Sequence, residues 1–358
     1  MSRLARAAIV SVLVILAAAP EAATAQQLTW ATRTTLYADN TEFFTPYRVG
    51  ETILGGQFIS ALRMRTGERT RIELGVFGDH RSGSDEFLDP VKPVIAFRYR
   101  HAGSTAELGT LVPERRHGYL EPLEVTTLEL TRPIEYGVQW STQRRRLDGE
   151  IFLDWQKINR PGQREVLDYG WVLRVRPVRF LSLEHQLHGL HHGGQLYDAG
   201  PVTNNVASGF GAVLSDSIRL GRGSLGLYRL RSAGNSDSAA PANRPRSGRG
   251  WYLRAAAAPR GWFELFSISW WGRDFISNEG DNNYNSVGAD PAFYRSRRKY
   301  WELGLLRRSR IEGDVTLDAE LRFHRIDNLS SIAIGRSKWE YSYRLVVRAP
   351  FEVVVKGS

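Results

Sequence analysis

Strict alternation of apolar and polar positions marks the C-terminal part of the chain. From Val315 to His324 every odd position is apolar and every even position is polar or charged. A second run starts at Trp339 and continues, with one exception, to Arg348. A period of two places successive side chains on opposite faces of a strand. These segments are therefore predicted to be β-strands with one apolar and one polar face, as in a soluble sandwich or in a membrane barrel with a wet lumen.

Turn residues divide the chain into sixteen such segments, most of them 8 to 13 residues long. A tilted transmembrane strand needs about 9–11 residues. Short connections containing Gly or Pro alternate with longer polar ones, which is typical of a barrel with tight turns at one end and loops at the other. The longest connection, 272–298, could fold inward, although an outer loop is the commoner outcome. The longer connections are 38–50, 79–93, 113–125, 158–165, 189–206, 232–250, 272–298 and 325–336.

The last strand is ambiguous in the sequence. Ala349-Pro350 has the composition of a turn, and it leaves Phe351–Val355 as a seventeenth apolar piece. Bacterial barrels normally have an even number of strands. Either this piece is a true strand and one earlier assignment is wrong, or it is a tail that folds back.

The N-terminus resembles a secretory signal. Arg3 and Arg6 precede an apolar run over 7–19, and Ala23-Thr24-Ala25 is a small-x-small cleavage site. The run is shorter than the roughly 20 residues of a transmembrane helix. We expect a signal peptide at 1–25 and a single barrel domain at 26–358. Because the chain has no cysteine, a disulfide framework is excluded.

Composition narrows the function classes. The chain of 358 residues carries 48 Lys and Arg against 38 Asp and Glu, a formal charge of +10. Its charges are interleaved along strands and its leader directs it out of the cytoplasm, so no nucleic-acid partner is expected. Tryptophan and tyrosine fall mainly near predicted strand ends, which fits two interfacial belts but also the general preference of aromatics for strands.

These features together resemble the outer-membrane β-barrels of Gram-negative bacteria, the porin-like class in particular. The resemblance covers roughly 28–356 and rests on the overall plan. It implies an all-β fold, a single antiparallel transmembrane barrel of about sixteen strands, with short periplasmic turns and long extracellular loops. It also implies outer-membrane lipid as a partner and a homotrimer as one oligomeric state, and it supplies no family-specific motif.

If the apolar faces contact lipid, the alternate positions on the other face of each strand identify the side chains that point into the lumen. Arginine rings in a water-filled pore favour anionic solutes, so we expect a porin-like channel or export pore for small, acidic or saccharide solutes. The alternative is that these arginines pair with acidic residues across strands and fill the interior. The predicted pore-lining residues are Arg98, Arg100, Arg174, Arg176, Arg322, Arg344, Glu320 and Asp318, and the same parity places Arg71, Glu73, Asp154, Glu184, His188 and Glu302 inside.

Other functions remain open as alternatives. An outer-membrane enzyme that hydrolyses lipid or polymer would depend on His188 or His324, the histidines that parity places on the wet face. No nucleophile motif surrounds either, so the sequence predicts no enzyme and no catalytic residue. No cofactor or metal is expected, because His185 and His188 fall on opposite faces of one strand. A soluble secreted β-sandwich that binds polysaccharide is the last alternative.

Overall fold

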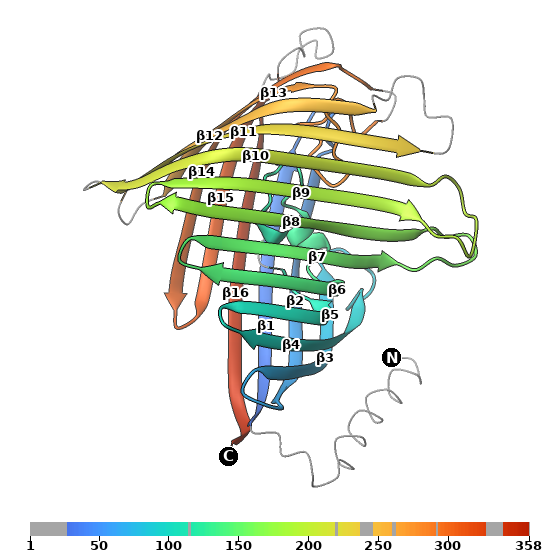
Figure 1. Cartoon of the computed structure of the whole chain (residues 1–358), viewed down its shortest axis with the longest axis vertical. Helices are drawn as coiled ribbons and strands as arrows, with labels where there is room; N and C mark the ends of the chain where they lie inside the picture. Colours follow the sequence, from blue (N-terminus) through green and yellow to red (C-terminus); the bar gives the residue numbers. More distant parts are fainter. Residues whose placement is uncertain are drawn as a thin grey trace.

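The computed structural model describes residues 27–113, 116–218, 221–236, 246–259, 263–290, 293–326 and 339–357. These residues form a closed barrel of antiparallel strands (Figure 1). The strands are β1 (Gln27–Glu42), β2 (Glu51–Arg65), β3 (Thr70–Arg81), β4 (Val91–His101), β5 (Ser104–Leu111), β6 (Glu135–Arg144), β7 (Leu147–Lys157), β8 (Glu165–Val178), β9 (Leu181–Gly193), β10 (Thr203–Ile218), β11 (Gly221–Ser236), β12 (Ser247–Pro259), β13 (Glu264–Arg273), β14 (Arg297–Glu312), β15 (Val315–Ile326) and β16 (Trp339–Gly357).

Each strand pairs with its neighbour in sequence, and β16 pairs with β1 to close the ring of sixteen. In this seam Leu36 lies opposite Val347 and Asp39 lies opposite Arg344. The predicted single antiparallel barrel is therefore confirmed. The expected signal peptide at 1–25 lies outside the described residues. Among those residues, no helix has the length and apolar character needed to cross a bilayer.

The wall is apolar outside and polar inside. On β15 and β16 the outward side chains Phe323 and Leu345 are 42% and 47% exposed, whereas the inward side chains His324 and Glu340 are 2% exposed. Large exposed apolar side chains recur on every part of the wall, as lipid contact requires and a water-soluble protein avoids. The fold is thus that of an outer-membrane barrel, and the soluble sandwich is excluded.

Connections alternate as the sequence predicts. Short turns, such as the one between β2 and β3, lie at one end of the barrel, here named the turn end, together with Gln27 and Gly357. Longer connections lie at the opposite end, here named the loop end. The strands extend further than their sequence signals indicate, so that β1 continues to Glu42 and shortens the expected 38–50 loop.

The ambiguous C-terminal piece belongs to β16. Ala349 and Pro350 are paired in register with Thr34 and Arg33 of β1, so the predicted turn there is wrong and the strand count stays even. Pairing of β16 with β15 ends at Arg348. Proline is tolerated at position 350 because beyond Arg348 β16 pairs with β1 and no longer with β15. The missing N–H therefore removes no hydrogen bond to a second neighbouring strand.

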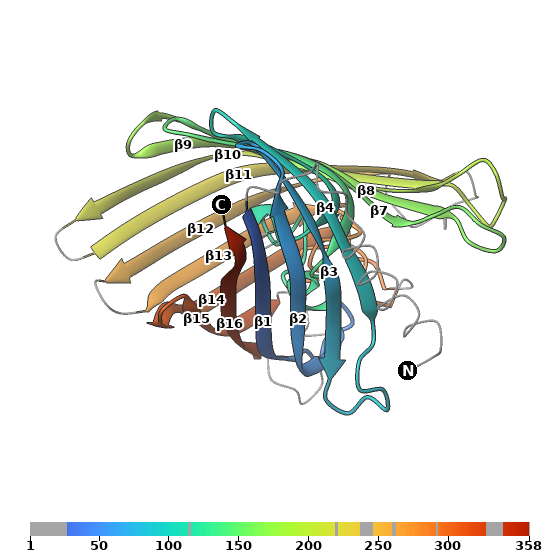
Figure 2. The same ribbon diagram turned by 90° about the horizontal axis from the view of Figure 1, so that it is seen from below.

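Two connections from the loop end fold into the barrel. The first, named inner segment A, runs from 116 to 134 and contains the short helices η1 (Arg116–Gly118) and α2 (Leu128–Thr131). Figure 2 shows this teal segment inside the ring of strands. The second, named inner segment B, covers 274–290. Both are anchored by apolar side chains that water does not reach, such as Leu123 of the first segment and Phe275 of the second, each 0% exposed.

Inner segment B overturns the expectation of an outer loop for 272–298. Its Asn and Ser side chains serve as internal hydrogen-bond partners: Ser277 N donates to Asn285 Oδ1 (2.8 Å), and Asn278 N donates to Asn205 Oδ1 on β10 (2.8 Å). A polar backbone can be buried when such side chains satisfy its N–H groups. Inner segment B also packs Tyr284 against Trp270 and Tyr300, which makes an aromatic core within the lumen.

Candidate active site

The predicted pore-lining arginines of β4 and β8 are engaged in ion pairs with neighbouring strands. Arg98 donates to Glu107 on β5 (2.6 Å), and Arg174 lies 3.5 Å from Glu184 on β9. Arg176 pairs with Asp148 on β7, while Arg100 is exposed beside the β4–β5 turn. Cross-strand pairing, the alternative weighed from the sequence, therefore describes three of these four residues.

The remaining predicted residues gather on β15 and β16. Arg322 donates to Glu302 (2.9 Å) and to Glu320 (2.8 Å). Arg344 pairs with Asp39 of β1, across the seam. Asp318 accepts a hydrogen bond from Arg348 (3.0 Å). Positive and negative groups thus alternate around the interior instead of forming a ring of one sign.

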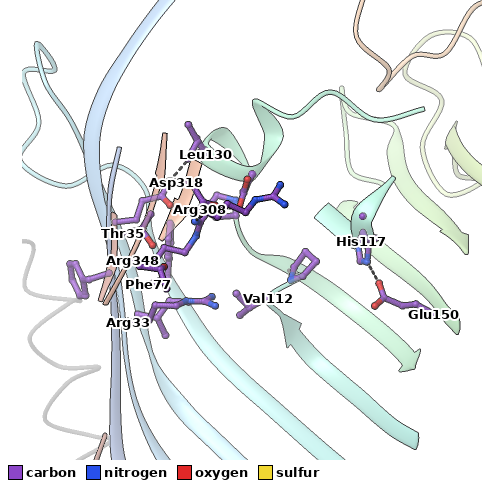
Figure 3. Close-up of a pocket in the computed structure, with 18 of the residues that line it drawn as sticks. Arg33, Thr35, Phe77, Val112, His117, Leu130, Glu150, Arg308, Asp318 and Arg348 are labelled. Atoms are coloured by element: carbon purple, nitrogen blue, oxygen red, sulfur yellow. Dashed lines mark hydrogen bonds and ion pairs between the residues drawn. The ribbon is translucent and has the colours of Figure 1, made fainter. Parts of the chain in front are cut away.

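A cavity of about 730 Å³ lies between inner segment A and the turn end. Figure 3 shows Arg33, Arg308 and Arg348 on one side of it, with His117 bonded to Glu150 on the other. This wet space contrasts with the loop end, where the two inner segments and the aromatic core fill the lumen. The described part of the barrel is accordingly plugged towards its loop end.

Inner segment A is held by a buried network of charged groups, here named the Arg116 network. Arg116 donates to Glu124 (Nε to Oε1, 2.8 Å) and to Glu135. Asp168 of β8 accepts hydrogen bonds from Arg132 (2.9 Å) and from His188 of β9 (2.6 Å). Breaking a buried pair of this kind leaves an uncompensated charge and costs about 3–5 kcal/mol. The network therefore fixes the plug against the wall.

His117 lies in the same network with an unusual backbone. Its φ is 61° and that of Arg116 is 48°, both in the left-handed region that non-glycine residues rarely adopt. Burial alone would lower the pKa of the His117 imidazole, but the Glu135 carboxylate and hydrogen bonds to Glu135 and Glu150 raise that pKa to about 10. The ring stacks on Phe152 with 3.7 Å between centroids. His117 is thus a structural cation at neutral pH.

A serine and a histidine meet near the loop end of β15 and β16. Ser342 Oγ lies 2.9 Å from His324 Nε2. Both side chains point inward, because both occupy even positions of the alternation. His324 is 2% exposed, and the register pairs it with Glu340, two residues before Ser342 on the same face. Strand geometry brings such diagonal neighbours within reach of each other.

The other nitrogen of His324 is oriented by a second pair of side chains on β14. Tyr300 Oη lies 2.5 Å from His324 Nδ1 and 2.6 Å from Glu302 Oε2. A tyrosine has one hydroxyl proton, and the carboxylate is the stronger acceptor. The proton therefore goes to Glu302, Nδ1–H donates to Tyr300, and Nε2 is left as an acceptor for the Ser342 hydroxyl. This tautomer suits a general base.

The surroundings of this group combine an aromatic cover with paired charges. The Phe43 ring lies 5.0 Å from the His324 ring, and Arg322 neutralises Glu302. Ser342, His324 and Arg344 line one cavity of about 20 Å³, which is room for about one water molecule. A serine hydroxyl, an oriented base and a guanidinium beside a space of this size are components of an acyl-transfer centre.

Sequence reasoning found half of this arrangement. It singled out His188 and His324, and the structure joins the first to the Arg116 network and the second to Ser342. Ser342 has no local motif, so the signal that would identify it is register: it occupies the polar face of β16 diagonally opposite His324. Phe43, the first residue after β1, covers the histidine.

These observations define a class: a β-barrel whose wall is lipid-facing, whose lumen is plugged, and whose interior carries a hydrogen-bonded serine and histidine. The sequence profile of the Lipid A 3'-O-deacylase-type family matches residues 20–356. The chain belongs to this family.

The family corrects one expectation from the sequence. The prediction that the chain is not an enzyme is contradicted, because the matching family is named for a deacylase activity. Sequence reasoning failed here because a barrel enzyme carries its reactive groups on separate strands, so that no contiguous motif marks them.

Solved structures with similar folds are outer-membrane proteins. OprD from Pseudomonas aeruginosa has a TM-score of 0.48 and 14% identity, with coverage of 92% of this chain and 98% of that one. OccAB4 from Acinetobacter baumannii has a TM-score of 0.47 and 10% identity, with coverage of 93% and 100%. No curated protein sequence matches the chain.

Proposed function

We propose that this protein is an outer-membrane hydrolase that removes an ester-linked acyl chain from an acylated saccharide lipid of the lipid A type. The observation that carries the proposal is the directed hydrogen-bond chain from Ser342 through His324 and Tyr300 to Glu302. Membership of a deacylase-type family supplies the substrate class.

The reaction follows from the direction of the hydrogen bonds. His324 Nε2 takes the Ser342 proton while Oγ attacks the ester carbonyl carbon. The tetrahedral intermediate then collapses: the bond to the saccharide oxygen breaks, and His324 returns the proton to that oxygen. Water, deprotonated by the same nitrogen, next attacks the acyl-serine and releases the fatty acid with Ser342 regenerated. Arg344, which lines the same cavity and pairs with Asp39 in the resting site, would turn its guanidinium towards the oxyanion.

The position of the serine suits an interfacial substrate. Ser342 lies three residues after the start of β16 at the loop end, and long loops face outside in barrels of this type. The ester bonds of a saccharide lipid lie at the junction of headgroup and acyl chains, close to the membrane surface. Because the resting cavity holds about one water, the substrate must displace the cover formed by Phe43.

An acyl-release assay tests the proposal. The refolded barrel in mixed micelles with lipid A should release fatty acid, detected by mass spectrometry, and Ser342→Ala and His324→Gln should each lower kcat by at least about 10³-fold. Ser182→Ala is the matched control, because Ser182 is an inward serine bonded to Glu184 and remote from the site. Equal activity in all four proteins would remove Ser342 and His324 from the mechanism.

A solute route, which would require the plug at the loop end to open, is the second candidate, favoured by the arginine-lined cavity of about 730 Å³ at the turn end. In planar bilayers, such a route would give conductance steps with anion preference, and Arg98→Ala or Arg174→Ala would weaken that preference. Inserted protein without conductance would leave the hydrolase as the sole candidate. The two experiments use the same refolded protein and give separate answers.

A further inference from the structure

The Arg116 network brings together buried carboxylates and cations. Arg132 is shared between Asp168 (2.9 Å) and Glu279 (3.3 Å). Each buried carboxylate needs cations or hydrogen-bond donors for its oxygens, because an unpaired buried charge is costly. The other buried members are the carboxylates Glu124, Glu135 and Asp168 and the cations Arg116, His117 and His188.

Three members of the network are arranged as ligands. Glu124 of inner segment A, Asp168 of β8 and His188 of β9 each place one ligand atom within 4.8 Å of the others. Their exposed fractions are 3%, 0% and 3%. Ligand atoms about 2.0–2.2 Å from Zn²⁺ lie roughly 3.4 Å apart in a tetrahedral site. On binding, the hydrogen bond between His188 Nε2 and Asp168 Oδ1 (2.6 Å) would open. The wider separations would close by up to about 1.4 Å, and a fourth ligand such as water would complete the coordination.

One oxygen of this group has no role in the network. Glu124 Oε1 accepts a hydrogen bond from Arg116 Nε, whereas the buried Glu124 Oε2 has no hydrogen-bond partner among the described residues. A buried carboxylate oxygen without a partner loses the hydrogen bonds that water would give it. This oxygen is therefore available to bind a cation.

A cavity reaches the edge of the same group. It has a volume of about 220 Å³, and Glu124 and Arg116 are among its lining residues. Its charged lining residues are of both signs, six arginines and five acidic residues, so the cavity gives access to Glu124 without concentrating cations.

From these observations we propose that Glu124, Asp168 and His188 bind one divalent cation of the Zn²⁺ or Mn²⁺ class. A mixed set of imidazole and carboxylate ligands suits these ions. The cation joins inner segment A to β8 and β9, so its role is to fasten the plug to the wall. This site is separate from Ser342 and His324, and the inference does not depend on the proposed hydrolase activity.

Metal content tests the site directly. The full barrel is refolded with ZnCl₂, washed with a weak chelator and analysed by mass spectrometry of the elements. We expect one zinc per chain in the wild type and none in Glu124→Gln or His188→Gln. His185→Gln is the matched control, because His185 is on the same strand but bonds Trp171 instead (2.8 Å). Wild type without zinc, or both ligand variants with full zinc, would overturn the proposal.

A second measurement covers the case in which a ligand variant fails to fold. In the folded wild type, ZnCl₂ should slow hydrogen exchange of inner segment A at least tenfold, because binding to the native state alone stabilises it. EDTA should restore fast exchange. Exchange rates that change neither with ZnCl₂ nor with EDTA would show that no cation fastens the segment.

Discussion

At the residue scale, Tyr300 is the least expected member of the Ser342 group. Its hydroxyl lies between His324 and Glu302. In many serine hydrolases a carboxylate contacts the histidine directly, with no side chain between them. Because Glu302 Oε2 lies 3.6 Å from His324 Nδ1, a hydrogen bond between them is absent and the tyrosine makes the connection. The hydroxyl therefore sets the tautomer of the base.

Removal of that hydroxyl tests its role. Tyr300→Phe should lower kcat on the order of 10–100-fold with little change in KM, since a misoriented base impairs proton transfer and leaves substrate binding intact. The pH profile of kcat should move at the same time, which mere loss of packing would not cause. Phe323→Leu on the lipid face of β15 is the control, and an equal loss there would refute a specific role for Tyr300.

Arg322 supports the same site through charge. It neutralises the buried Glu302 and also pairs with Glu320. Arg322→Met would leave these buried carboxylates without their cation, and we expect a loss of about 3–5 kcal/mol in the free energy of unfolding. Arg310→Met is the matched control, because Arg310 and its partner Asp314 are 70% and 73% exposed, and exposed pairs contribute at most about 1 kcal/mol. Urea titration of both variants in detergent compares them.

At the element scale, inner segment A is the part whose stability depends most on charge. The pKa of His117 rises from 6.5 to about 10 on folding. A raised pKa means that the folded state holds the proton more tightly, so the stabilisation is complete below about pH 6.5 and is lost as the pH rises through about 10.

This linkage predicts release of the plug in alkali. Hydrogen exchange in inner segment A should accelerate between pH 8 and pH 11, after correction for the intrinsic rate, while the wall strands remain protected. His117→Gln should remove the pH dependence and loosen the segment at every pH. Protection that stays constant to pH 11 would contradict a charged His117.

The elements also show how far the sequence could predict the fold. Alternation identified the faces of β15 and β16 because each outward side chain meets lipid and each inward one meets charge. It failed at Pro350, whose tolerance depends on where β15 ends, and at inner segment B, whose asparagines resemble an exposed loop until Asn205 supplies their partner. Ser342 was missed for the same reason: its partner comes from a neighbouring strand, and register cannot be read from one segment.

At the scale of the whole molecule, the barrel is apolar on its outer face and polar inside, the reverse of a water-soluble protein. Its folded state is therefore stable only with lipid or detergent around the outer face. Leu227, near the middle of β11, is 48% exposed on the outer face. Leu227→Arg should destabilise the barrel by about 2–4 kcal/mol in lipid, the cost of an arginine near the bilayer midplane. Leu227→Phe should be nearly neutral. Unfolding titrations in vesicles compare the two, and equal stability would place Leu227 outside the membrane.

The seam between β1 and β16 has a kinetic consequence. Gln27 lies opposite Gly357 at one end of the seam and Glu42 lies opposite Tyr341 at the other, so this ladder joins segments that are far apart in the chain. Closing so long a loop makes the seam a slow step of assembly. Until it forms, β1 and β16 each expose a strand edge that other chains could join. The nascent barrel therefore depends on protection of these two edges. In the finished barrel they pair with each other, and β16 keeps a free edge only on its β15 side beyond Arg348, as far as the described residues show.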